Sequence, residues 1–419
     1  MSSVSNHFRH VIVGGGVTGA SIAYHLAKGL VAAPQIQNTE HGNSICVLDR
    51  ATVGSGQTSR SAGIVLHEHK NSIGVELAKQ TGDDIFKDLA VHTGDIILEQ
   101  PGSYNATTRV LNTQDFFVDP QSLVTGYLRR AKQLVAESSS SALRLHENTD
   151  VQEIFVNLED KGNAGVRLQT SSGVITADCV YLAAGVWSDS FLYDTYWANL
   201  RSHYWEFSWS KSEYLDTKLK QAAMPMYFAP GVYMKLSRNR RTVEIGIQEE
   251  QSLVVPKPPK HNSDGLGLDN DDEDLFGPTE LLLAKQSVIE EQLGHNFFEI
   301  ADMRAYISGL STYTADGLPV IHVNLAQDIN EQSSPRGLVA CGGCNGYGIT
   351  WAGGLGKMLA NIGLGHTDTS ISTGKETNAE TDMFADLSAH RFEGYSTDTV
   401  RDLAVTQRHN KFVETHSDS

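Results

Sequence analysis

Three glycines near the N-terminus have the spacing of a turn that can hold the diphosphate of a dinucleotide. Gly14, Gly16 and Gly19 directly follow the apolar run 10–13 (His-Val-Ile-Val). The first glycine permits a tight turn, the second lets the backbone approach a pyrophosphate, and the third lets the next helix pack on the strand. A helix start here would offer free N–H groups to the phosphates. Helical spacing does follow the turn, at Ala20, Ala23, Tyr24 and Ala27.

An acidic residue closes the next predicted strand. Residues 44–48 (Ser-Ile-Cys-Val-Leu) have the character of a buried strand that ends on Asp49, which completes a strand–helix–strand unit. A carboxylate at this place accepts hydrogen bonds from ribose hydroxyls, usually ~20 residues past the glycines. Asp49 lies farther along because a polar stretch, 32–43, precedes the strand. The unit predicts a dinucleotide site without choosing between NAD and FAD.

Four later segments make that choice. Segment 54–63 (GSGQTSRSAG) is rich in glycine and hydroxyls, and 180–188 (VYLAAGVWS) is a strand that ends in small residues. Segments 309–319 (GLSTYTADGLP) and 342–350 (GGCNGYGIT) flank the last two predicted strands. In this order along the chain, the four resemble the flavin-contacting elements of the D-amino-acid oxidase and sarcosine oxidase superfamily of FAD-dependent oxidoreductases. The resemblance extends over most of the chain.

The resemblance implies an α/β fold in which a Rossmann-like FAD-binding domain is interleaved with a substrate domain built on an antiparallel sheet. The alternating Tyr, Val and Ile residues of 224–248 agree with such a sheet. We expect a discontinuous FAD-binding domain at 8–75, 143–200 and 318–385, and a substrate or cap domain at 76–142 and 201–317. We also expect an acidic, proline-rich, mobile insertion at 254–278 and a polar tail at 386–419.

FAD is expected to be bound without a covalent link. In the sarcosine oxidases a cysteine stands near the position of Gly309, and in the dimethylglycine dehydrogenases a histidine stands near Arg60; neither is present here. The residues expected to hold FAD are those of the glycine turn, the strand ends and the flavin loops: Gly14, Gly16, Val17, Thr18, Gly19, Asp49, Arg50, Thr58, Ser59, Ser61, Ala62, Gly63, Val151, Ala184, Gly185, Trp187, Gly346, Tyr347, Gly348, Ile349 and Thr350.

The implied reaction is hydride transfer from a nitrogen-bearing carbon to flavin N5, which gives an imine that water hydrolyses. Tyr227, Tyr233 and Lys235 lie on strands expected to cover the flavin, and Tyr347 is expected beside its ring. These four are the candidate catalytic residues.

The residues with which this superfamily usually binds a substrate carboxylate are not matched in this sequence. Ser311 stands where the D-amino-acid dehydrogenases carry an arginine, and Thr350 stands where the sarcosine oxidases carry a lysine. Lys235, Arg241 or Arg304 could replace these groups, and their spacing does not choose among them.

The sequence therefore predicts an FAD-dependent oxidase or dehydrogenase for an amino acid or a secondary or N-methyl amine, with oxygen or an electron carrier as acceptor. Two alternatives stay open. One is oxidation of a 2-hydroxy acid, and the other is a non-catalytic flavoprotein, such as the respiratory-complex assembly factor that shares this fold. Turnover of any amine would exclude the non-catalytic alternative. The substrate and the oligomeric state are not predicted.

The amino-acid composition excludes some other classes of protein. The net charge of −17 argues against a nucleic-acid surface, and the hydrophobic fraction of 40% argues against bulk disorder. There is no apolar run of about 18 residues and no room for a signal peptide, so a soluble, cytoplasmic protein is expected. Cys341 and Cys344 have the spacing of half a zinc site, but no second pair completes it, so no metal is expected.

Overall fold

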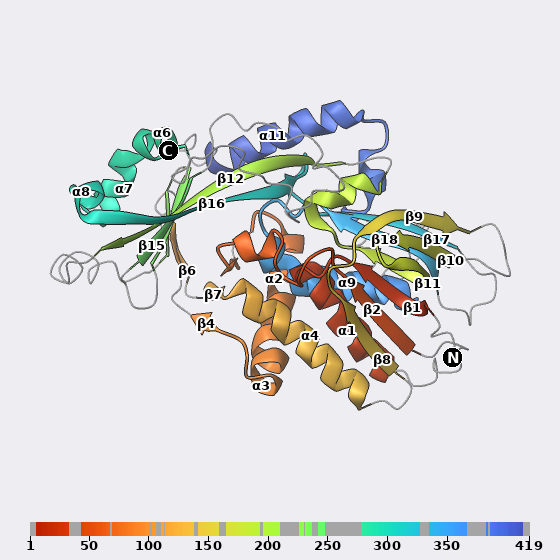
Figure 1. The fold of residues 1–419 in the computed structure, drawn as a ribbon. Coiled ribbons are helices and arrows are strands. Elements are labelled where there is room, and N and C mark those ends of the chain that lie inside the picture. The colour runs from red at the N-terminus through yellow and green to blue at the C-terminus, as the bar shows by residue number, and fades with distance from the viewer. Residues whose placement is uncertain are drawn as a thin grey trace.

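The structure, a computed structural model, is built from two large sheets and one small sheet with helices packed against them (Figure 1). It confirms the predicted α/β class, with a largely parallel sheet and a separate, largely antiparallel one. All but one residue of the acidic insertion predicted at 254–278 lies outside the described residues. These are 6–32, 43–67, 69–99, 103–105, 110–112, 114–137, 141–158, 165–192, 196–209, 226–229, 231–236, 242–247, 278–326, 335–366, 383 and 386–413.

The eight-stranded sheet has β1 (His7–Val13) in its interior. Val11 pairs in parallel register with Cys46 on one side and with Val180 on the other. Because both faces of β1 are covered, residues 8–13 are all buried, and the strand ends in the continuous apolar run 11–13 instead of an alternating pattern. The strand order is β17-β18-β11-β1-β2-β8, with β9 and β10 attached through β11. The bounds are β2 (Asn43–Leu48), β8 (Ser141–His146), β9 (Val151–Asn157), β10 (Gly165–Thr170), β11 (Gly173–Leu182), β17 (Val320–Ala326) and β18 (Arg336–Gly342).

Helices on one side of this sheet share a core with it (Figure 1). The glycines of α9 let it pack closely on α1, since a Cβ added to Gly356 would lie 2.7 Å from the Cβ of Ser21. On the other face of the sheet, Val11 and Val180 pack with Leu168 of β10. The helical bounds of this layer are α1 (Val17–Ala32), η2 (Thr58–Arg60), α2 (Ser72–Asp84), η3 (Ile85–Leu89), α3 (Ala90–His92), α4 (Pro120–Ala136), η4 (Gly185–Ser190) and α9 (Gly348–Leu364).

The second sheet has seven strands in the order β16-β12-β15-β14-β13-β5-β6, and every pair except β13–β5 is antiparallel. Trp205 and Ile245 on this sheet pack against Ile289 and Phe297 of the short helices that cover its outer face. The bounds are β5 (Ser103–Asn105), β6 (Val110–Asn112), β12 (Ala198–Trp209), β13 (Met226–Ala229), β14 (Val232–Leu236), β15 (Thr242–Ile247), β16 (Ala301–Tyr313), α6 (Thr279–Ala284), α7 (Gln286–Leu293) and α8 (Phe297–Ile300).

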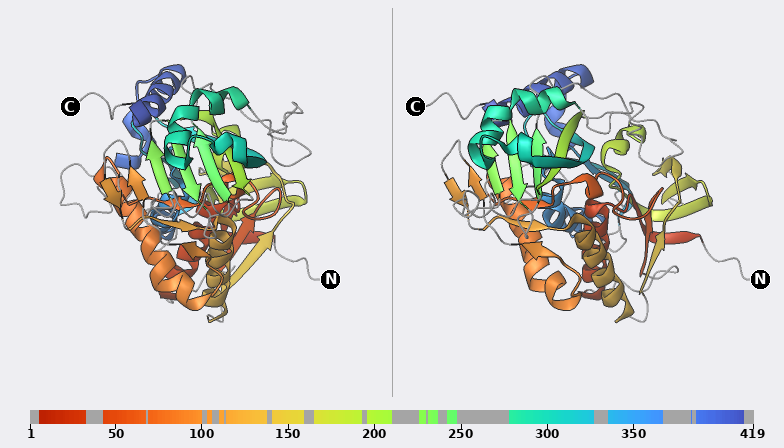
Figure 2. Two further views of the ribbon diagram at one scale, coloured as in Figure 1. Left: turned by 90° about the vertical axis from the view of Figure 1, so that its left-hand side faces the viewer. Right: turned by 60° about the vertical axis from the view of Figure 1, so that its left-hand side comes forward.

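Segment 76–142, assigned from the sequence to the substrate domain, mostly packs elsewhere. Leu123 and Tyr127 of α4 share a core with α1, and Leu77 of α2 shares it with α9. Figure 2 shows these orange to brown helices on the opposite side of the molecule from the teal helices α6–α8. The difference arises because a helix with one apolar face can pack on any apolar partner, and its own sequence does not name that partner. A small sheet, β3 (Ile64–Val65), β7 (Phe116–Val118) and β4 (Leu98–Glu99), also lies in this region.

The predicted polar tail contains η5 (Ala389–Phe392) and a long helix, α11 (Thr397–Val413). α11 lies along β12 and β16 (Figure 1). Its buried residues Val400, Ala404 and Arg408 follow one another at four-residue spacing, which places them on one face. In the described part of the chain, no helix is both long and apolar enough to span a bilayer.

Candidate functional site

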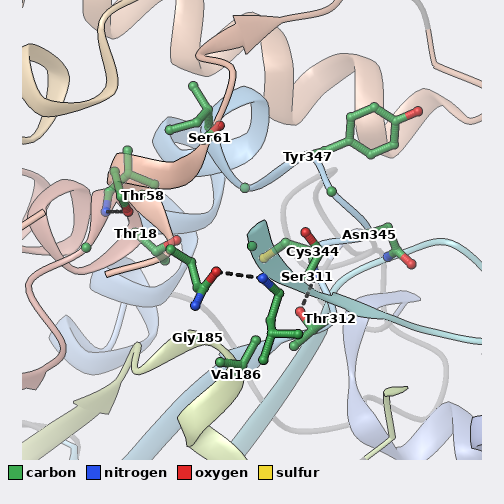
Figure 3. A pocket seen from close by; sticks show the side chains of 18 of the residues that line it. Thr18, Thr58, Ser61, Gly185, Val186, Ser311, Thr312, Cys344, Asn345 and Tyr347 are labelled. Atoms are coloured by element: carbon green, nitrogen blue, oxygen red, sulfur yellow. Dashed lines mark hydrogen bonds between the residues drawn. The ribbon is translucent and has the colours of Figure 1, made fainter. Parts of the chain in front are cut away.

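A pocket of about 720 Å³ lies between the carboxyl ends of the parallel strands and the seven-stranded sheet. Figure 3 shows residues that line it. One side is formed by the residues that follow β1, β2 and β11 and by the loop between β18 and α9. The opposite side is formed by β12, β14, β15 and β16. Ligands of open α/β sheets bind outside the carboxyl ends of the strands, so this is where a dinucleotide is expected.

The glycine turn brings two strand ends together. Gly14 has a φ of +104°, and a Cβ there would lie 2.5 Å from the carbonyl oxygen of Ala183. A Cβ on Gly19 would collide with the carbonyl oxygen of Gly14, so α1 could not start so close to the strand. Only glycine satisfies both the backbone angle at Gly14 and the close approach at Gly19.

The start of α1 and the end of β2 are tied to this turn by side chains. The backbone N–H of Val17 donates to Thr58 Oγ1 over 3.1 Å. Asp49 Oδ2 accepts from the backbone nitrogen of Gly15 at 2.7 Å, and its Oδ1 accepts from that of Ala51 at 2.9 Å. Burial raises the pKa of the Asp49 carboxyl, while these two bonds oppose the rise. Carboxylate oxygens have further lone pairs, so Asp49 can also accept from a ligand hydroxyl.

Several buried nitrogen atoms of pocket-lining side chains have no hydrogen-bond partner among the described residues. Among them are Arg50 Nη2, Gln57 Nε2 and Trp187 Nε1. The guanidinium carbon of Arg50 lies 3.9 Å from the centre of the Trp187 ring, and burial lowers the Arg50 pKa. Buried donors are costly when left unpaired. The wall is therefore suited to a large ligand that carries acceptor oxygens or ring nitrogens.

The start of α9 forms another part of the wall. Thr350 Oγ1 donates to the carbonyl oxygen of Ile64 over 3.1 Å, which ties the helix start to β3. Asn345, at a positive φ of 53°, accepts from the backbone nitrogen of Thr314 through Oδ1 at 2.9 Å. Burial raises the pKa of the Cys344 thiol to about 12, so this pocket-lining cysteine stays protonated at neutral pH. The wall is thus neutral here and rich in backbone N–H groups.

The seven-stranded sheet contributes aromatic side chains. Tyr233 lines the pocket and donates its hydroxyl to Glu244 Oε1 over 3.1 Å. Burial raises the pKa of Tyr233 well above its usual range, so the phenol stays a hydrogen-bond donor. His203 also lines the pocket, and its Nδ1 shares a hydrogen bond of 2.6 Å with the Tyr306 hydroxyl.

Most of the residues selected from the sequence meet in this pocket. Five described ones do not line it: Gly19, Ser59, Gly63, Lys235 and Arg304. Ser59 donates instead to the carbonyl oxygens of Ser55 and Gly56, and Lys235 Nζ donates to the carbonyl oxygen of Ala62 over 2.6 Å. The side chain of Tyr227 in β13 lies outside the described part of the structure. Those that line it are Gly14, Gly16, Val17, Thr18, Asp49, Arg50, Thr58, Ser61, Ala62, Val151, Ala184, Gly185, Trp187, Tyr233, Gly346, Tyr347, Gly348, Ile349 and Thr350.

The sequence did not single out several other pocket residues. Arg408 is 1% exposed and lines the pocket, and its Nη2 donates to the carbonyl oxygen of Arg201 over 2.6 Å. The four-residue spacing of Val400, Ala404 and Arg408 was an available signal for a packed helix. Asp115, which is 2% exposed, also lines the pocket, and no local motif marks it.

A dinucleotide-type turn at the carboxyl edge of a parallel sheet, covered by an aromatic face of a second sheet, defines a nucleotide-cofactor oxidoreductase of two interleaved parts. The chain belongs to the DAO family, described as FAD dependent oxidoreductases, whose model matches residues 9–112 and 106–362. FAD is the cofactor of this family, and the unpaired donors and glycine turn described above fit it. The predicted family is confirmed.

Sequence relatives and solved structures agree with this family assignment. The chain is 24% identical over 393 residues to 4-methylaminobutanoate oxidase (formaldehyde-forming) of Paenarthrobacter nicotinovorans, covering 84% of this chain and 43% of that protein. It is 26% identical over 234 residues to glycine oxidase of Bacillus subtilis, covering 45% of this chain and 57% of that protein. The chain thus spans about half the length of these relatives.

Among solved structures, L-proline dehydrogenase from P. horikoshii has a TM-score of 0.62 at 16% identity, with 86% of this chain and 94% of that chain covered. Glycine oxidase from Bacillus cereus has a TM-score of 0.60 at 18% identity, with 87% and 99% covered. At these identities the likeness shows the fold alone.

Proposed function

We propose that this protein oxidises a C–N bond of an amine or amino acid to an imine, which water then hydrolyses. FAD, when bound, supplies the hydride acceptor for this chemistry. The observation that carries the proposal is that Tyr233 and His203 of the second sheet line the same pocket as Tyr347 of the loop before α9. The names of the relatives, which include a methylaminobutanoate oxidase, a glycine oxidase and a dimethylglycine dehydrogenase, support the same class.

The chain's own residues would hold FAD along the pocket. The start of α1, at Gly16 to Thr18, offers N–H groups to the diphosphate, and Thr58 keeps one hydroxyl hydrogen to donate. Asp49 would accept from ribose hydroxyls. Arg50 and Trp187 would bind the adenosine half, since Arg50 Nη2 and Trp187 Nε1 have no hydrogen-bond partner among the described residues.

At the other end, Tyr347 to Thr350 and the start of α9 would face the isoalloxazine ring. A helix start stabilises negative charge beside it, and Thr350 keeps this helix start fixed to β3. Tyr233, whose single hydroxyl hydrogen is donated to Glu244, would orient the substrate by accepting a hydrogen bond from its N–H group. The surrounding burial excludes water and favours the neutral amine that can lose hydride.

The experiment is an anaerobic screen of the FAD-loaded protein. Primary, secondary and N-methyl amines, amino acids and 2-hydroxy acids are added one at a time. Reduction of the flavin is followed by the loss of its absorbance at about 450 nm. Bleaching by amines and not by hydroxy acids is expected. Bleaching by hydroxy acids alone would replace the proposal with the hydroxy-acid alternative, and no bleaching by any compound would favour a non-catalytic flavoprotein. Reoxidation by air or by an added dye then distinguishes an oxidase from a dehydrogenase.

A further inference from the structure

The short helix η2 lies between the glycine turn and the end strand of the second sheet. Thr58 of η2 binds the start of α1, while Gln57 and Arg60 bind the backbone of β16. We propose that Gln57 and Arg60 hold the second sheet in a fixed position over the flavin side of the pocket, as positioning residues of the proposed reaction. The inference rests on the proposed amine oxidation and adds to it two residues that act through the backbone of β16.

The first step concerns the open edge of the second sheet. β16 is the last strand on one side of this sheet, among the strands that the structure describes. In an antiparallel pair, the N–H and C=O groups of every second residue point away from the partner strand. Ser308 and Leu310 are two residues apart, so their outward groups lie along the same edge. Both residues are buried, at 2% and 3% exposed, so these groups need partners within the protein.

The second step concerns those partners. Gln57 Oε1 accepts from the backbone nitrogen of Leu310 at 2.7 Å, and Arg60 Nη1 donates to the carbonyl oxygen of Ser308 over 2.7 Å. One acceptor and one donor thus bind β16 as the backbone of a neighbouring strand would. Gly309 lies close to both side chains, since a Cβ there would be 3.4 Å from Gln57 Oε1 and 3.7 Å from the Cβ of Arg60. The loop therefore takes the place of a further strand at this edge.

The third step concerns the other side of η2. The backbone nitrogen of Val17 donates to Thr58 Oγ1 over 3.1 Å, so the residue that follows Gln57 is fixed to the start of α1. The turn itself is closed by backbone hydrogen bonds from Arg60 to Gln57 at 3.2 Å and from Ser61 to Thr58 at 3.1 Å. η2 is thus a closed turn that is bonded to the diphosphate side of the pocket at one face and to the second sheet at the other.

The fourth step concerns what β16 positions. Ser308 pairs with His203 of β12, which lines the pocket together with the next residue, Tyr204. The ring centre of Tyr204 lies 5.8 Å from that of Tyr233 on β14. Because the strands between them are hydrogen-bonded in one sheet, a shift of β16 would move this aromatic wall relative to the start of α1. A small error in the position of a substrate relative to the group that accepts its hydride lowers the rate strongly.

The first test needs no substrate and uses the FAD-loaded protein. Hydrogen exchange of the Leu310 amide is followed by mass spectrometry, and exposure of the flavin is measured by quenching its fluorescence with acrylamide, a neutral quencher. Gln57→Met should speed exchange at Leu310 about tenfold, because this N–H loses its acceptor. Gln57→Met and Arg60→Met should each raise the quenching constant about twofold, because the sheet edge opens more often. Gln57→Glu, which keeps an acceptor oxygen, should match the unaltered protein in both measurements.

The second test measures positioning in the reaction. At full FAD occupancy and saturating amine, the limiting rate of flavin reduction should fall about 10–100-fold in Gln57→Met and in Arg60→Met. Gln57→Glu should recover this rate, which a loss of folded protein alone would not predict. Gln133→Met removes a bond of 3.3 Å to the carbonyl oxygen of His92 on the surface, and it should change none of the three measurements.

Unchanged exchange and unchanged quenching in the methionine variants would overturn the inference, and so would an unchanged limiting rate. If a methionine variant fails to fold, Gln57→Asn is measured with the same expectations, since it keeps the amide but shortens its reach by a methylene group. If no amine reduces the flavin of the unaltered protein, the proposed function fails. Exchange and quenching then decide whether η2 holds the sheet in place.

Discussion

Gly309 and Arg60 are neighbours in space: a Cβ added to Gly309 would lie 3.7 Å from the Cβ of Arg60. Gly309 is on β16 and Arg60 ends η2, so the contact joins the two large parts of the fold. The resemblance to flavin-linked relatives points to both positions, the first for a cysteine and the second for a histidine. Their proximity indicates that the two attachment positions belong to one place in the pocket, where this chain carries no nucleophile.

FAD should therefore be released intact when the protein is denatured. Neither glycine nor a guanidinium, protonated at any ordinary pH, can form the link. Heat or acid precipitation followed by chromatography of the supernatant should recover free FAD in a 1:1 ratio to protein, about one flavin per chain, with a colourless pellet. Flavin fluorescence that stays with the chain on a denaturing gel would contradict this expectation.

Gly16→Val should abolish FAD binding. A Cβ at this position would already lie 3.1 Å from Thr58 Oγ1, and the larger side chain would occupy the approach to the diphosphate. Asp49→Asn is the graded comparison: it keeps one side-chain oxygen for the backbone N–H groups and should weaken FAD binding less. Flavin absorbance of the purified variants measures both. A full flavin spectrum in Gly16→Val would refute the assignment of the turn.

Acid stability should depend on His10. Burial lowers the pKa of this fully buried histidine from 6.5 to about 3. The unfolded chain therefore binds a proton that the folded chain does not between these values, so the stabilisation is present above pH 6.5 and is lost as the pH falls toward 3. His10→Gln should show a smaller loss of unfolding free energy over this range in urea titrations. His366→Gln, on the exposed surface, should follow the unaltered protein.

Lys235 should act through the flavin loop and not through the reaction. Its Nζ donates to the carbonyl oxygen of Ala62 and lies 3.6 Å from Glu244 Oε2. Lys235→Met should weaken FAD retention while leaving turnover of the FAD-saturated protein within about threefold. Lys79→Met, at an exposed ion pair with Glu76, is the matched control. A large loss of turnover at full FAD occupancy would instead make Lys235 catalytic.

Two glycines of α9 should respond in opposite ways to alanine. At Gly356 the added methyl would collide with Ser21 of α1, so Gly356→Ala should lower the free energy of unfolding by about 1–3 kcal/mol. At Gly348 nothing lies within 4 Å, so Gly348→Ala should raise the stability of the FAD-free protein by about 0.5–1 kcal/mol. Gly348 lines the pocket, so the same change should weaken FAD binding. Denaturant titrations with and without FAD separate the two effects.

The sequence predicted the glycine turn and strand ends well because their geometry is local. Gly14, Gly16 and Gly19 are required by the path of the backbone between one strand and one helix, so their spacing alone predicts the turn. Ser59 shows the limit: the hydroxyl type matched the expected site, but rotation about one bond directs it to nearby carbonyl groups instead.

Features that depend on pairing across long distances were not predictable. Asp115 reaches the pocket because β7 pairs with β3, and no spacing of residues in the sequence predicts that pairing. The apolar face of α4 was visible, but its packing on α1 instead of the second sheet depends on the whole core. In α11, the buried face includes Arg408, so its hydrophobic pattern is weak and the segment resembles a polar tail.

The position of α11 affects where a shortened form of this protein could end without losing part of the pocket. The family match ends at residue 362, while Gln407 and Arg408 line the pocket. A fragment trimmed to the matched segment would keep every cofactor motif and lose part of one wall. In such a fragment bulk water would reach the part of the pocket that α11 now covers. The family match therefore ends before the residues that complete the pocket wall.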